Sequence, residues 1–169
     1  MTVALWFAVL GAALVVLALW GFAAGYPPAP LAPSRLSPKE QAVLAACADA
    51  LVPRGGSLPL SATDAGVIAY FDRMLGELPL ETRALIKLLL HFLEHGPWVF
   101  DRRARLTRQT EAEREATMRA WSTSDVYFQR IALISMRTLL AMAYLADPRV
   151  VAALGAEANL SPFEPGASA

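Results

Sequence analysis

The chain has 169 residues, 56% of them hydrophobic and 18% charged, and its 15 basic side chains balance 15 acidic ones. A neutral chain creates no overall field that would attract nucleic acid, so that class of partner is not expected. The single cysteine, Cys47, excludes an internal disulfide and haem c attachment, and its alanine neighbours predict a buried small side chain. Only Lys39 and Lys87 are lysines, and this preference for arginine is typical of a GC-rich bacterial coding sequence.

Residues 3–25 carry no charge, and the first charged side chain is Arg35. At 1.5 Å per residue this stretch is about 33 Å long, enough for one helix to cross a hydrocarbon core of roughly 30 Å. Trp6, Trp20 and Tyr26 mark its two ends, where aromatic rings prefer the lipid–water boundary. We therefore expect residues 1–25 to be a transmembrane anchor that places 3–25 in the lipid bilayer. The alternative is a signal peptide that is cleaved near Gly25.

The basic residues follow the apolar stretch and do not precede it, which by the positive-inside rule places the remainder of the chain in the cytoplasm. The expected location is therefore the bacterial inner membrane, with a single span. Residues 26–36 contain four prolines and predict a semi-rigid linker between the anchor and the globular part.

Helix signals recur along the rest of the chain. Ser37 at the N-cap, Pro38 at N1 and Glu40 at N3 predict a helix over 38–52. The other predicted helices are bounded by capping residues, glycine or proline, and they cover 61–75, 80–95, 110–121, 125–146 and 147–155. The third of these helices is expected to end at Gly96-Pro97, with glycine just past the last turn and proline after it.

The predicted helix over 125–146 is long and apolar, but it contains Arg130 and Arg137, each of which costs about 2.5–3.5 kcal/mol near the centre of a bilayer. We therefore expect it to be the central buried helix of a bundle. Since no stretch alternates as a strand does, the predicted fold is all-α: a single N-terminal transmembrane helix followed by a small irregular helical bundle over 37–155. A flexible tail is expected over 156–169.

His91 and His95 are four residues apart on one predicted helix, a spacing that can present two metal ligands. No further ligands cluster near them in the sequence, and the chain contains neither a glycine-rich dinucleotide motif nor a phosphate-binding loop. The sequence therefore predicts no catalytic, cofactor-binding or metal-binding residue in this chain.

Two aromatic side chains and a run of arginines follow the helix over 80–95. An aromatic anchor beside arginines is a common composition for the centre of a protein interface, so the predicted contacts with a larger subunit are Trp98, Phe100, Arg102 and Arg105. One alternative is that the aromatics fill the base of the bundle. For the arginine run, the alternatives are contacts with lipid headgroups or ion pairs with Glu111, Glu113 and Glu115.

Several stretches are similar to those of a known family. They are Leu36-Ser37-Pro38-Lys39-Glu40 through Ala50-Leu51-Val52-Pro53, the helix end His95-Gly96-Pro97, and Thr110 to Trp121 followed by a long helix and Tyr144-Leu145-Ala146-Asp147-Pro148-Arg149-Val150. Over 36–155 the chain thus resembles the gluconate 2-dehydrogenase subunit 3-like family, small helical proteins that accompany FAD-dependent glucose–methanol–choline-type dehydrogenases. The resemblance implies a larger flavoprotein partner that carries FAD, and it transfers no catalytic residue to this chain.

The apolar anchor, the lack of catalytic motifs and the abundance of apolar helix surface lead to one expectation. The protein is expected to be a non-catalytic, membrane-anchored accessory subunit that binds and positions a larger redox enzyme. The resemblance makes a flavin-dependent alcohol or sugar dehydrogenase the expected enzyme. One alternative is an auxiliary structural subunit of another multi-subunit membrane complex, and another is an enzyme or ligand carrier that uses a pocket between helices.

Overall fold

The computed structural model describes residues 11–13, 16, 24–32, 35–56, 58 and 60–160. This part of the chain contains helices and no strand, which confirms the all-α fold class. Its elements are α2 (Pro38–Leu51), α3 (Val67–Glu77), α4 (Leu80–Asp101), the 3-10 helix η1 (Leu106–Arg108), α5 (Glu111–Ser122), α6 (Tyr127–Leu145) and α7 (Pro148–Leu160).

Most of the predicted transmembrane helix over 3–25 lies outside the described residues, although 11–13 and 16 are helical. Among the residues that are described, no single helix combines the length and apolar character needed to cross a membrane. α6 and the first half of α7 meet that test only when taken together, as a pair bent by 87°.

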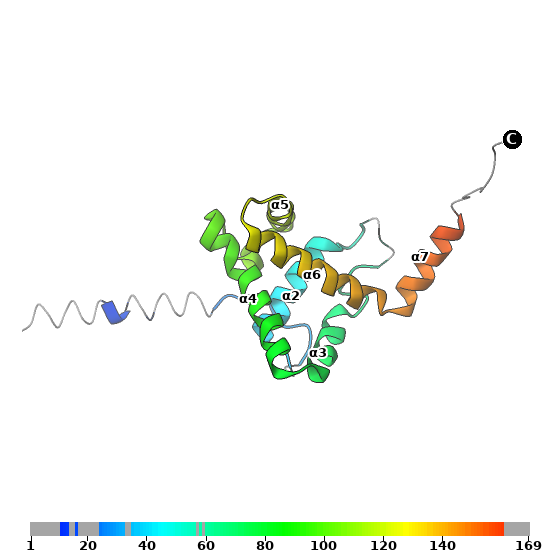
Figure 1. The fold of residues 1–169 in the computed structure, drawn as a ribbon, viewed down its shortest axis with the longest axis horizontal. Helices are drawn as coiled ribbons and strands as arrows, with labels where there is room; N and C mark the ends of the chain where they lie inside the picture. Colours follow the sequence, from blue (N-terminus) through cyan, green and yellow to red (C-terminus); the bar gives the residue numbers. More distant parts are fainter. Residues whose placement is uncertain are drawn as a thin grey trace, which may run out of the picture.

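The helix at the centre of the bundle is α2, which packs against α3, α4, η1, α5 and α6 (Figure 1). Its side chains are short, many of them alanine, so neighbouring helices approach it closely from several directions. α6 is buried along one side and exposes large apolar side chains along the other. α6 also packs against five elements, α2, α3, α4, α5 and α7, so the expectation that the helix over 125–146 would be the central buried one is met on its inner side only.

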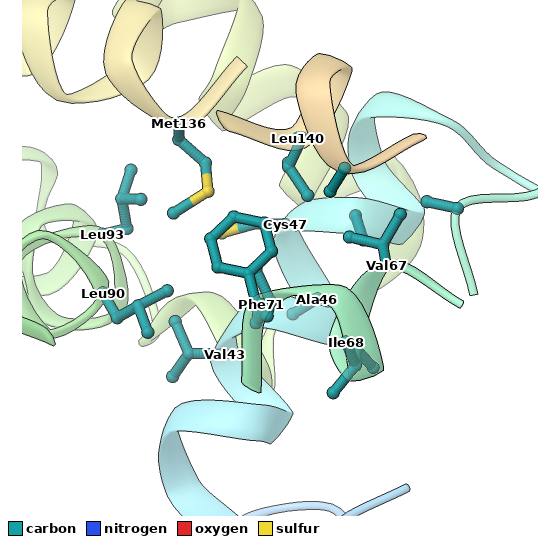
Figure 2. Close-up of a cluster of buried hydrophobic side chains, with 14 of the residues drawn as sticks. Val43, Ala46, Cys47, Val67, Ile68, Phe71, Leu90, Leu93, Met136 and Leu140 are labelled. Atoms are coloured by element: carbon teal, nitrogen blue, oxygen red, sulfur yellow. The ribbon is translucent and has the colours of Figure 1, made fainter. Parts of the chain in front are cut away.

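The core is built from side chains of α2, α3, α4 and α6 that point toward one another around Phe71 (Figure 2). Phe71, Cys47, Leu90 and Met136 are all fully buried within it. The prediction that Cys47 is a buried small side chain is confirmed. Burial raises the pKa of its thiol to about 12, so the side chain stays protonated and behaves as an apolar group.

Two helix starts agree with the sequence signals. The Ser37 N–H donates to Glu40 Oε2 at 2.7 Å, and the Glu40 N–H donates to Ser37 Oγ at 3.3 Å, which is a complete capping box. Thr110 and Glu113 form the same reciprocal pair at the start of α5. Each box satisfies backbone donors that the first helical turn leaves without partners.

The second predicted helix begins six residues later than expected. Ser61 and Asp64 form a separate turn, in which the Asp64 N–H donates to Ser61 Oγ at 3.1 Å and Ser61 Oγ donates to Asp64 Oδ2 at 2.7 Å. Gly66 then takes a left-handed conformation with φ of 68°, which redirects the chain before α3 starts at Val67. Ser61 does act as a capping residue, but it caps a single turn and not the start of α3.

The third predicted helix does not end at Gly96-Pro97, because α4 continues to Asp101. Gly96 is a packing residue: a Cβ there would lie 2.4 Å from Cη2 of Trp121, so only glycine lets α5 approach α4 this closely. The end of α4 is set at Arg102, which has a left-handed φ of 53°, and the Arg103 N–H donates to the Pro97 carbonyl at 3.0 Å.

The proline-rich stretch before α2 is bound to the bundle. Gln41 accepts from the Leu31 N–H at 3.0 Å and donates to the Leu36 carbonyl at 3.3 Å. Asp72 accepts from the backbone N–H groups of Arg35 and Leu36 at 2.8 and 2.9 Å. These bonds fix the path of the described part of 26–36 across α2 and α3, so this part of the predicted linker packs as a layer of the bundle.

α7 continues past Gly155 to Leu160, which makes the first five residues of the predicted tail helical. Residues 161–169 lie outside the described residues. α7 projects from the end of the molecule opposite to the stretch that begins at Ala24 (Figure 1).

Candidate functional site

α4 has two different sides. The side toward the bundle carries Ile86, Leu90 and Leu93, all buried, at the three- and four-residue spacing of one helix face. The opposite side also carries large apolar residues, and these are exposed: the side chain of Leu88 is 63% exposed, and Leu85 is similar. A helix that is apolar on both sides has more apolar surface than its own bundle covers.

An apolar groove with a volume of about 560 Å³ lies between α4 and α6, and its lining runs from their buried faces to exposed side chains such as Leu88 and Ile131. We call it the α4/α6 groove, and its lining contains two hydroxyl side chains and no charged group: Thr82, Leu85, Ile86, Leu88, Leu89, Phe92, Phe128, Ile131, Ala132, Ser135 and Leu139. An uncharged groove of this size fits a ligand or a protein segment that is itself apolar.

The apolar surface continues from the groove along the outer face of α6. Tyr127, Ile131, Ile134, Met142 and Leu145 are all exposed and share one helical face, on which only the exposed Thr138 separates Ile134 from Met142. Arg130 and Arg137 flank this stripe, and the Arg130 guanidinium lies 6.0 Å from the centroid of the Tyr127 ring. Ile131 belongs to both the stripe and the groove lining, so the two apolar surfaces are continuous there. Contiguous exposed apolar surface of this extent is typical of interaction sites.

The four interface candidates from the sequence do not form one patch. Phe100 is 50% exposed and belongs to the groove side of α4, since its ring centroid lies 5.9 Å from that of Phe92 in the lining. Trp98 is 57% exposed and follows His91 by one heptad, so it lies on the side of α4 that carries Glu94 and His95. Both aromatics are outside the core, so the alternative that they fill the base of the bundle was wrong.

The two candidate arginines also separate. Arg102 is exposed at the left-handed end of α4. Arg105 is only 7% exposed and points into the molecule, where its Nε lies 3.7 Å from Glu94 Oε1. Its guanidinium is therefore a structural group of the bundle, and its burial removes Arg105 from the surface that a partner could contact.

Glu94 is the centre of a buried polar cluster on α4. Its carboxylate is completely buried, accepts from the Thr107 N–H at 3.0 Å and from Thr107 Oγ1 at 2.7 Å, and forms the ion pair with Arg105. Burial raises the pKa of the Glu94 carboxyl, against the opposite effects of Thr107 and Arg105. The cluster attaches η1 to the middle of the bundle and neutralises the charge of Arg105.

The same arginine holds the beginning of the described chain, and we call this set of contacts the arginine clamp. Arg105 donates to the Ala24 carbonyl at 2.9 Å and to the Tyr26 hydroxyl at 3.2 Å, and its guanidinium stacks over the Tyr26 ring at 4.8 Å. Arg108 also donates to the Ala24 carbonyl, at 3.1 Å. Gly25, with φ of 80°, leaves room for this, because a Cβ there would lie 2.6 Å from Arg108 Nη2.

The basic run therefore has internal partners other than those considered from the sequence. Arg103 donates to Thr117 Oγ1 at 3.4 Å, and Glu113 caps its own helix. Glu115 pairs with Arg119 one turn along α5. In the described region, no ion pair joins the loop arginines to Glu111, Glu113 or Glu115.

The two histidines stack face to face, with ring centroids 6.3 Å apart and planes inclined by 3°. Burial, followed by the positive charges of Arg105, His91 and Lys39, lowers the pKa of His95 to about 4, so it is neutral at pH 7. Among the described residues, no group of three or more His, Cys, Asp or Glu side chains is placed to hold a metal ion.

The sequence analysis missed the role of Glu94, although a signal was present. Glu94 lies on the buried face of α4, eight residues after Ile86 and four after Leu90, where an acidic residue requires a buried partner. Arg105 is the matching cation. It lies in the loop after α4, so the sequence spacing does not indicate that its side chain pairs with Glu94. The α4/α6 groove was foreseen only as an excess of apolar helix surface, because its two walls are about 45 residues apart in the chain.

We compared the chain with models of protein families, with curated proteins and with solved structures, and none of the three comparisons gave a match.

Proposed function

We propose that this protein is a non-catalytic, membrane-anchored accessory subunit that binds a larger redox enzyme through the α4/α6 groove. The observation that carries the proposal is the groove itself, an uncharged surface that the bundle leaves open beside an apolar stripe on α6. Burying such a surface against a partner gains about 25 cal/mol for each Å² of apolar area removed from water.

The character of the groove supports a protein partner with an apolar helix or loop. The large exposed side chains of the lining are Leu85, Leu88, Phe128 and Ile131. Phe128 is 70% exposed and is an aromatic anchor of the kind that dominates interface energies. Phe100 extends the same surface toward the end of α4. This argues for a partner that inserts apolar side chains between two helices.

The resemblance of 36–155 to the gluconate 2-dehydrogenase subunit 3-like family supports a flavin-dependent alcohol or sugar dehydrogenase as the partner. FAD would then be carried by that partner, and the predicted span over 3–25 would keep the pair at the bacterial inner membrane, with the bundle in the cytoplasm. The second candidate is a structural subunit of another membrane complex, which the same groove would serve equally well.

The test is copurification from detergent-solubilised membranes of the native host, with mass spectrometry of the bound proteins. The groove variant combines Leu88→Gln with Ile131→Gln, and the control is Val151→Gln, an equally exposed apolar residue on α7. We expect one larger subunit to copurify with the wild type and the control, and to be lost from the groove variant at equal membrane yield.

Flavin absorbance in the purified complex separates the two candidates: its presence supports the dehydrogenase, and a complex without flavin supports the second candidate. Retention of the larger subunit by the groove variant would contradict the assignment of the groove.

A further inference from the structure

The structure supports an inference about the orientation of the bundle relative to the membrane. We propose that the end of the bundle formed by Trp98, Arg102, Arg103 and Arg108 lies on the anionic lipid surface. The inference rests on the anchoring part of the proposed function, and it is independent of which enzyme binds the groove.

The first observation concerns the place where the uncharged N-terminal sequence meets the bundle. Arg105 and Arg108 both donate to the carbonyl of Ala24, at 2.9 and 3.1 Å. The continuous described chain therefore begins at the arginine clamp, and Ala24 and Gly25 are the last two residues of the predicted span over 3–25. Because 24–32 is itself bound to the bundle, no free spacer separates the clamp from the predicted span.

The second step is the charge around this point. Arg102, Arg103 and Arg108 are exposed, whereas the charge of Arg105 is opposed by the buried Glu94. Over 101–110 the sequence has four arginines and one acidic residue, Asp101. A cation close to an anionic bilayer strengthens binding about fivefold at low screening, and the effect fades over roughly 10 Å.

The third step is the position of Trp98. It lies one turn beyond Glu94 on the side of α4 that faces the clamp, and it is more than half exposed. Tryptophan is enriched where a protein meets the lipid–water boundary, because its ring is apolar and its N–H is polar. A partner in the groove would contact the other side of α4, so the groove leaves this end of the bundle uncovered.

The test uses spin labels on the full-length protein in lipid nanodiscs. Cys47 is completely buried with a raised pKa, so it does not react, and labels are introduced through Trp98→Cys and, as the control on α7, Val151→Cys. Accessibility to a water-soluble nickel chelate is measured in discs of phosphatidylcholine alone and in discs that also contain phosphatidylglycerol. A third sample adds Arg102→Gln and Arg103→Gln to the Trp98→Cys chain.

We expect the label at position 98 to lose nickel accessibility in the anionic discs, and the label at position 151 to remain accessible in both. The two arginine substitutions should restore accessibility at position 98. Equal accessibility at the two positions in anionic discs would overturn the inference, as would protection of position 98 that appears only after the larger subunit is added. Failure of the full chain to enter the discs would also overturn it.

The outcome is separable from that of the copurification. Loss of the partner from the groove variant concerns Leu88 and Ile131, and those substitutions should leave nickel accessibility at position 98 unchanged. Protection at position 98 in a protein that captures no larger subunit would support the lipid contact and contradict the accessory function.

Discussion

Each side of α4 departs in one respect from the usual arrangement, in which apolar side chains are buried and charged ones are exposed. On the inner side a carboxylate and a guanidinium are buried and bonded to each other, to Thr107 and to the chain near Tyr26. On the outer side leucines and phenylalanines face solvent along the α4/α6 groove. The polar groups of the inner side find all the partners described above within this chain. The apolar side chains of the outer side have no neighbours in the bundle that would remove them from water. One helix can therefore have charged groups that are fully bonded inside the chain on one side and apolar groups without packing neighbours on the other.

The largest test of this comparison removes the buried acid. Glu94→Ala removes the buried carboxylate that opposes the charge of Arg105 and binds Thr107, and we expect the free energy of unfolding to fall by about 3–5 kcal/mol. Chemical denaturation of the detergent-solubilised protein measures the change. The control is Glu115→Ala, which removes an exposed pair with Arg119 and should cost about 0.3–0.5 kcal/mol. If Glu94→Ala lowered the free energy of unfolding by less than about 1 kcal/mol, this ion pair would not be what stabilises the inner side of α4.

A second test concerns the close approach of α5 to α4. Gly96→Ala places a methyl group against the ring of Trp121, and we expect a loss of about 1–3 kcal/mol from overpacking. Gly155→Ala on α7 is the matched control, since a Cβ there meets nothing within 4 Å, and it should stabilise the helix by about 0.5–1 kcal/mol. Equal effects at the two glycines, read from thermal melting, would argue that Gly96 is not a packing residue.

A third test measures how the stability contributed by the inner side of α4 depends on pH. The pKa of His95 is about 4 in the folded protein and near 6.5 when unperturbed, so the unfolded chain binds the proton more readily. The contribution of His95 to stability is thus complete above pH 6.5 and is lost as the pH falls toward 4. His95→Asn should flatten the decline in melting temperature over this interval relative to the wild type. Parallel pH profiles for the two proteins would contradict the assignment.

The smallest expected effect belongs to the outer side. Leu88→Gln replaces an exposed leucine of the groove, and we expect the free energy of unfolding to change by no more than about 0.5 kcal/mol. Self-association of the protein, followed by light scattering at the lowest detergent concentration that keeps it in solution, should decrease because exposed apolar area is removed. A loss of several kcal/mol would show that Leu88 supports the bundle, and the groove would then be part of the core.

Local signals in the sequence were sufficient to predict the all-α fold class and several helix boundaries. The capping residues Ser37 and Thr110 act within four residues of themselves, so their effect can be predicted without knowing the fold. Gly96 could not be read correctly, because a glycine at a helix end and a glycine at a helix crossing look alike until Trp121 is seen beside it. The pairing of Glu94 with Arg105 and the meeting of α4 with α6 depend on the tertiary arrangement, which periodicity does not specify.

The continuity of α4 through Pro97 has a mechanical consequence. Leu85 in the groove and Trp98, beyond Pro97, are thirteen residues apart on one helix, which corresponds to about 20 Å along its axis. A helix that stopped at His95 would have placed a hinge before the aromatic segment. Because the helix continues, no loop separates the groove from the end of the bundle that carries Trp98, and the spacing and relative orientation of the two surfaces are those of a single helix.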